Sequence, residues 1–104
     1  MPEFITVANT GEIAPGYIKL VEVDGHAIAL CNADGTFYAL DDICTHEHKS
    51  ISDGEIEDDV ITCISHGSQF NLKTGAVERG PANKPLPTYQ VMVQGDEVKI
   101  ARPT

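Results

Sequence analysis

The sequence predicts an all-β protein, a small sandwich or barrel of antiparallel sheets. No window of about 11 residues carries the apolar stripe of an amphipathic helix. Short apolar runs instead alternate with turn dipeptides such as Asp24-Gly25 and Gly95-Asp96, which favour tight hairpins. The 9 glycines, the 6 prolines and the absence of tryptophan are also typical of a small domain with many turns.

The first 42 residues predict four strands joined by short turns. Two of the turn signals end in Asp-Gly, a pair that tolerates the positive φ of a tight turn. We expect strands near 4–7, 17–23, 26–31 and 36–40, with turns at 24–25 and 32–35.

The second half predicts three hairpins and one irregular loop. The segment 80–87, GPANKPLP, holds too many prolines for a helix or a central strand. We expect a hairpin over 54–63 turning at Asp58-Asp59, another over 69–77 turning near Thr74-Gly75, and a last one formed by 88–94 and 97–101. The sequence therefore predicts one domain over 1–104, in which a strand scaffold (1–42 and 85–104) carries an inserted functional module (43–84).

The charge of the chain excludes several partners. Sixteen acidic residues against seven basic ones give a net charge of −9, which repels nucleic acid and anionic lipid surfaces. Five acids over 53–59 form either a docking face or a solvated hairpin. No apolar run reaches the roughly 18 residues of a membrane span, and the first residues lack a signal peptide, so we expect a soluble, cytoplasmic protein.

Two short Cys/His pairs carry the chemistry of the chain. Cys44-Thr45-His46 and Cys63-Ile64-Ser65-His66 lie sixteen residues apart, each on a turn-rich loop, and the third cysteine, Cys31, ends a predicted strand as a small buried side chain. Two thiolates and two imidazoles can hold one tetrahedral zinc or one two-iron, two-sulfide cluster. The cluster is favoured because each loop supplies one ligand of each type and no helix is predicted. Gly67 after His66 lets the backbone approach it.

These residues resemble those of the Rieske iron–sulfur proteins. The resemblance rests on C-T-H, C-x-x-H-G, Phe70 and the loop Gly80-Pro81-Ala82, and it runs from about 16 to 100. It implies a cluster-binding subdomain that holds one [2Fe–2S] cluster. It also implies that Pro81 lies in a third loop of this subdomain, which covers the cluster. It also implies that Cys44 and Cys63 bind the inner iron and that His46 and His66 bind the outer, solvent-facing iron.

Departures from the family pattern predict a low reduction potential. Thr45 and Ile64 stand where many members have proline, and Lys49 and Ser65 stand where respiratory relatives have a disulfide. Ser68 is either a hydrogen-bond donor to the cluster or a turn residue, whereas Phe70 lacks the hydroxyl of a second donor. Fewer donors stabilise the reduced state less, so a redox titration should place the potential in the lower part of the Rieske range of about −150 to +300 mV.

The resemblance implies an electron carrier without catalytic residues of its own. Similar proteins take single electrons from an NAD(P)H-dependent flavoprotein reductase and pass them to a terminal ring-hydroxylating oxygenase, which requires a monomer that exchanges partners. A Rieske-type subunit or redox sensor fixed in another complex, and a structural zinc module, are the alternatives. His48 and His26 are expected to be a surface loop residue and a surface or packing residue.

Overall fold

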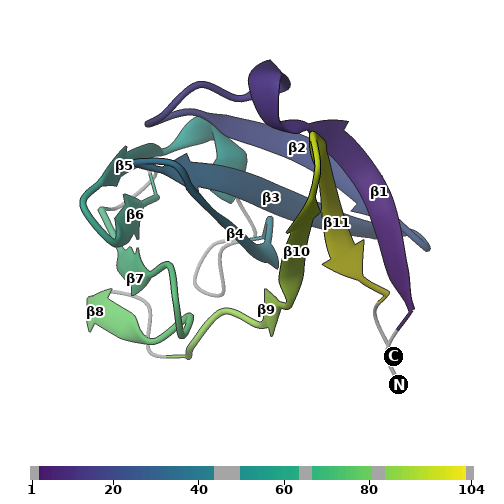
Figure 1. Ribbon diagram of the computed structural model, residues 1–104. Coiled ribbons are helices and arrows are strands. Elements are labelled where there is room, and N and C mark those ends of the chain that lie inside the picture. The colour runs from purple at the N-terminus through teal and green to yellow at the C-terminus, as the bar shows by residue number, and fades with distance from the viewer. Residues whose placement is uncertain (1–2, 44–49, 64–66, 81–83, 103–104) are drawn as a thin grey trace.

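A computed structural model of the chain describes residues 3–43, 50–63, 67–80 and 84–102 (Figure 1). Within these ranges the chain forms eleven strands and two 3-10 helices of three residues each. In chain order the elements are β1 (Phe4–Asn9), η1 (Thr10–Glu12), β2 (Ile18–Val23), β3 (His26–Ala33), β4 (Thr36–Asp41), η2 (Ile51–Asp53), β5 (Glu55–Glu57), β6 (Val60–Thr62), β7 (Gln69–Asn71), β8 (Val77–Arg79), β9 (Thr88–Tyr89), β10 (Val91–Gln94) and β11 (Glu97–Ala101).

The strands form three antiparallel sheets, as the sequence predicts. The first sheet has the order β1-β11-β10, the second β2-β3-β4-β9 and the third β5-β6-β7-β8. The first and last described strands meet in the first sheet, where Phe4 pairs with Ala101. The third sheet lies on the opposite side of the molecule from these strand ends (Figure 1). No helix in the described ranges is both long enough and apolar enough to cross a membrane.

Asp-Gly turns set the hairpins of the second sheet. Asp24 and Gly25 have φ of 51° and 82°, and Asp34 and Gly35 have φ of 53° and 94°. Two successive residues with positive φ match the right-handed twist of the flanking strands. The second turn is shorter than the four residues predicted, because β3 continues through Asn32 to Ala33, which pairs with Thr36.

The predicted strand over 88–94 is divided between two sheets, which corrects the sequence prediction. Thr88 and Tyr89 pair with β4, whereas Val91–Gln94 pairs with β11. The side chain of Tyr89 donates a hydrogen bond to Asp41 Oδ1 at 2.7 Å and so stays with β4. The chain therefore passes from the second sheet to the first at Gln90. Strand propensity cannot predict this change of sheet, because it depends on contacts with distant strands.

Strand β3 of the second sheet is buried on both faces, and its alternating side chains enter two different cores. Ile28 and Leu30 of β3 pack against Val98 and Ile100 of β11 in a first core. On the other face of the same strand, Ala29 joins a second core shared with the third sheet. The buried residues of this second core are Ala29, Cys31, Ala33, Leu40, Ile51, Ile61, Cys63, Phe70, Leu72 and Leu86.

Cys31 is a buried apolar residue of the second core, as predicted. Its thiol contacts the carbonyl oxygen of Ala29 at 3.8 Å. Burial, and to a lesser extent the charge of Asp42, raise the pKa of the Cys31 thiol to about 12. Cys31 therefore keeps its proton at neutral pH.

This raised pKa predicts a loss of stability at alkaline pH. An unfolded cysteine ionises near pH 8.5, so between there and about pH 12 the folded chain holds a proton that the unfolded chain releases. The stability that the protonated Cys31 thiol contributes is complete below this pH range and is lost as the pH rises through the range. We expect the difference in unfolding free energy between wild type and Cys31→Ala to narrow by about 2 kcal/mol from about pH 8 to about pH 10. Guanidinium unfolding under anaerobic, reducing conditions measures it, and a difference that is constant with pH would contradict it.

Candidate metal centre

Of the four predicted ligands, Cys63 lies in the part of the chain that the structure describes. Cys44, His46 and His66 lie outside the described residues, as do His48 and Pro81. Cys63 directly follows β6 and is 1% exposed. The residues that flank each of the three undescribed internal segments are described, and they define how the site is built.

The second ligand loop connects the two strands of a hairpin, β6 and β7. Thr62 of β6 pairs with Gln69 of β7, and the residues 63–68 join these two strands. The Cys63 N–H donates to the Ser68 carbonyl at 2.8 Å, and the Gly67 N–H donates to the Cys63 carbonyl at 3.1 Å. Gly67 has φ of +77°, a conformation that favours glycine.

Ser68 is a buried residue of this loop, 1% exposed, and its role as a donor to the cluster or as a turn residue stays a prediction. Phe70, two residues later, is fully buried in the second core. Approach of the Gly67 backbone to a cluster stays a prediction, since no heavy atom described by the structure lies within 4 Å of a Cβ built there.

The first ligand loop is closed at its base by main-chain pairing. Ile43 forms an isolated antiparallel bridge with Ser50, and the Ile51 N–H donates to the Asp42 carbonyl. Helix η2 follows directly, and its Ile51 side chain is fully buried in the second core. The two ends of the segment that carries Cys44 and His46 are thereby held side by side.

Gly54 brings the base of the first loop against the end of β6. A Cβ at Gly54 would lie 2.0 Å from the carbonyl oxygen of Thr62 and 3.1 Å from that of Ile51. Thr62 is the residue before Cys63, so this contact places the residues that follow the first ligand loop against the start of the second. The contact could not be predicted from the sequence, because it joins residues that only the fold brings together.

We expect Gly54→Ala to separate these loops and to cost about 3 kcal/mol of stability, because two backbone segments must move. Gly11→Ala is the matched control, since Gly11 has no positive φ and no neighbour within 4 Å. Thermal unfolding of both variants measures the difference. Equal midpoints would mean that the contact at Gly54 relaxes without cost.

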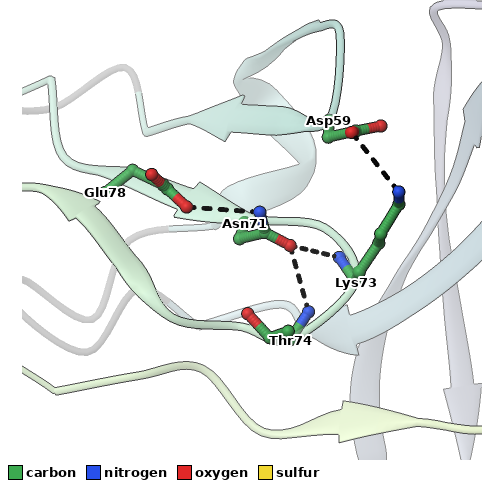
Figure 2. Close-up of polar contacts among 5 residues, drawn as sticks. All are labelled: Asp59, Asn71, Lys73, Thr74 and Glu78. Carbon is green, nitrogen blue, oxygen red and sulfur yellow. Dashed lines mark hydrogen bonds and ion pairs between the residues drawn. The ribbon is translucent and has the colours of Figure 1, made fainter.

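The turn between β7 and β8 is organised by Asn71 (Figure 2). Its Oδ1 accepts hydrogen bonds from the backbone N–H groups of Lys73 at 2.8 Å and Thr74 at 3.2 Å, and its Nδ2 donates to Glu78 at 3.2 Å. The Lys73 ammonium lies 3.5 Å from a carboxylate oxygen of Asp59, in the turn of the neighbouring hairpin. Asn before a turn is a local signal for this geometry, so the role of Asn71 can be predicted from the sequence although it is not among the residues singled out above.

The turn between β7 and β8 also contacts the C-terminal part of the proline-rich segment 80–87. The Leu86 N–H donates to the Gly75 carbonyl at 2.8 Å, and the Leu86 side chain is buried in the second core. Gly75 has φ of +77°, and a Cβ there would lie 2.0 Å from the Leu86 carbonyl oxygen. The third loop, which carries Pro81, is therefore fixed on its C-terminal side.

The second core unites the three loops. Ile51 follows the first ligand segment, Cys63 begins the second and Leu86 follows the third, and all three side chains belong to this core. An apolar wall on one side of Cys63 fits the thiolate side of a cluster, which is shielded from water. The described residues therefore fit a [2Fe–2S] group at Cys63.

Exposed carboxylates surround the hairpin between the ligand loops. Asp53, Glu55, Glu57, Asp58 and Asp59 are all exposed. A role for them in docking stays a prediction. His26 is also exposed, at the start of β3, which agrees with a surface role.

Three antiparallel sheets with paired loops on one buried core, and a Cys/His pair in each of two loops, define the class of Rieske iron–sulfur proteins. The family model "Rieske [2Fe-2S] domain" matches residues 3–90, and the chain belongs to this family. This confirms the resemblance noted in the sequence and the all-β fold.

Relatives and solved structures carry related names. The chain is 36% identical over 94 residues to the ferredoxin component of biphenyl 2,3-dioxygenase from Rhodococcus jostii (strain RHA1), covering 90% of this chain and 88% of that protein. It is 46% identical over 77 residues to the 3-phenylpropionate/cinnamic acid dioxygenase ferredoxin subunit of Escherichia coli (strain K12), covering 73% of each. A chain in a solved complex of reduced oxygenase and oxidized ferredoxin in carbazole 1,9a-dioxygenase superposes with a TM-score of 0.89 at 35% identity, covering 94% of this chain and 92% of that one. The names are those of electron-transfer components, which agrees with the expectation that the chain is not itself a catalyst.

Proposed function

We propose that this chain is a Rieske-type ferredoxin that carries single electrons from an NAD(P)H-dependent flavoprotein reductase to a terminal ring-hydroxylating oxygenase. The observation that carries the proposal is the second core, in which Ile51, Cys63 and Leu86 lie together although they flank three different loops. Membership of the Rieske [2Fe–2S] domain family supports the cofactor.

Cys44, His46, Cys63 and His66 would hold one [2Fe–2S] cluster, with the cysteines at the inner iron and the histidines at the outer one. Such a cluster, when bound, accepts and gives up one electron at a time. The protein's part is to shield the thiolate side with the second core and to fix the loop ends through the Ile43–Ser50 bridge and the Gly75–Leu86 pair. On this proposal, 1–104 is a single Rieske-type domain whose cluster-binding subdomain (43–84) is inserted in a scaffold of 1–42 and 85–104.

The names of the relatives support the partners. Relatives are called ferredoxin components of dioxygenases, and a similar chain occurs in a complex of oxygenase with ferredoxin. A terminal oxygenase is therefore the electron acceptor that we propose. The reductase as donor, the monomeric state and the cytoplasmic location follow from the role of a shuttle that draws on NAD(P)H.

Metal analysis and electron paramagnetic resonance spectroscopy test whether the chain binds a [2Fe–2S] cluster. Two irons and two acid-labile sulfides per chain, with a Rieske spectrum after dithionite reduction, are expected. One zinc per chain would instead support a structural zinc module.

Stopped-flow mixing tests the shuttle. Reduction by a ferredoxin reductase, followed by turnover of a ring-hydroxylating oxygenase that depends on the ferredoxin, is expected. Gel filtration should show a monomer. A stable complex that passes no electrons to any oxygenase would favour a fixed subunit or a redox sensor.

A further inference from the structure

Asp42 is a buried carboxylate at the start of the first ligand loop. It is 2% exposed and is one of the few buried polar residues among those described. Its Oδ1 accepts the backbone N–H of Ser52 at 2.8 Å, and its Oδ2 accepts the hydroxyl of Ser50. The Ser50 and Ser52 hydroxyl oxygens lie 2.7 Å apart. The carboxylate thus joins the residues before the loop to those after it.

The backbone of Asp42 makes the same connection. Its carbonyl accepts the Ile51 N–H, and its own N–H donates to the Ala27 carbonyl of β3 at 2.9 Å. The C-terminal end of the first loop is therefore attached, through one residue, to the second sheet. Buried hydrogen bonds to a carboxylate are stronger than neutral ones and are costly to leave unpaired.

The attachment matters for the site because of Ile51. This residue lies between the two serines that Asp42 binds, and its side chain shares the second core with Cys63. A shift of 50–52 away from Asp42 would move one ligand loop relative to the thiol of the other.

We propose that Asp42 is a positioning residue of the cluster site. By holding Ser50 and Ser52, its carboxylate fixes the separation of the two ends of the segment that carries Cys44 and His46. This inference rests on the proposed function, since it concerns the same cluster.

The chain offers a matched control in the preceding residue. Asp41 also accepts a side-chain hydroxyl, that of Tyr89 at 2.7 Å, but this bond ties β4 to β9 and does not reach the loop. Tyr89→Phe therefore removes a similar bond close by without releasing the loop, and Asp41→Asn removes a neighbouring charge without releasing it.

The test compares Ser50→Ala and Asp42→Asn with these controls in the cluster-containing protein. Ser50→Ala removes the two contacts of the Ser50 hydroxyl, to Asp42 and to Ser52, without changing charge, and Asp42→Asn keeps the size of the side chain. For both we expect shifted paramagnetic resonance lines in the reduced protein and loss of visible absorbance to an iron chelator about tenfold faster than wild type. The double variant should lose its cluster more slowly than the sum of two independent changes would predict, because both changes act on the bond between Asp42 and Ser50. Asp41→Asn and Tyr89→Phe should keep the wild-type lines and stay within about twofold of its rate.

Two results would overturn the inference. One is wild-type lines and rates in both Ser50→Ala and Asp42→Asn. The other is a change in Asp42→Asn alone, which would mean that the bond to the Ser50 hydroxyl does not hold the end of the loop. If the wild-type protein itself binds no cluster, the proposed function fails, and that result is read before any variant is compared.

Discussion

Cys63→Ala is expected to abolish cluster binding, whereas Cys31→Ala is expected to retain it. The two thiols make a close comparison, because both are buried in the second core. Cys63 begins the turn of 63–68, where the backbone reverses between two strands. Cys31 lies inside β3 and contacts the Ala29 carbonyl, and burial keeps it protonated.

The measurement is iron and sulfide content after purification under anaerobic conditions, with the visible spectrum as a second readout. We expect no iron in Cys63→Ala and the wild-type content in Cys31→Ala. A colourless Cys31→Ala that is still folded by circular dichroism would contradict this assignment. So would a Cys63→Ala that keeps the wild-type spectrum.

Gly75→Ala is expected to be the most destabilising of the glycine substitutions. A Cβ at Gly75 would meet the Leu86 carbonyl oxygen at 2.0 Å and the Thr88 Cγ2 at 3.1 Å, and the residue has φ of +77°. Backbone strain and steric overlap together cost about 3 to 4 kcal/mol, a large part of the 5 to 15 kcal/mol typical of a domain. In a chain of this size the melting temperature should fall by about 15 °C.

Gly95→Ala separates the two causes. Gly95 has φ of +61°, but nothing lies within 4 Å of a Cβ built there. It should lose only the backbone strain of about 1 to 2 kcal/mol. Equal losses in both variants would show that the overlap of the added Cβ with the Leu86 carbonyl relaxes without cost.

The sequence predicted those parts of the fold that depend on neighbouring residues. Asp-Gly turns at 24–25 and 34–35 require positive φ, which is a property of the residues themselves, and they were predicted within two residues. The change of sheet at Gln90 was not predicted, because it depends on which distant strand each segment meets.

The same distinction holds for the site. The two Cys/His pairs were visible because metal ligands must be of a few residue types at short spacing. The close contacts at Gly54 and Gly75, and the buried carboxylate of Asp42, join segments that are separated in the sequence. A glycine or an aspartate in a loop does not reveal such a contact in the sequence, because the contact exists only in the folded chain.

The pairing of Phe4 with Ala101 has a practical consequence. Both described ends of the chain lie together, on the opposite side of the molecule from the third sheet (Figure 1). A tether to an electrode, or a fusion to another protein, can therefore be attached at either end while the third sheet faces the solution. Current measured with the two attachments should differ little, because both orient the molecule in the same way.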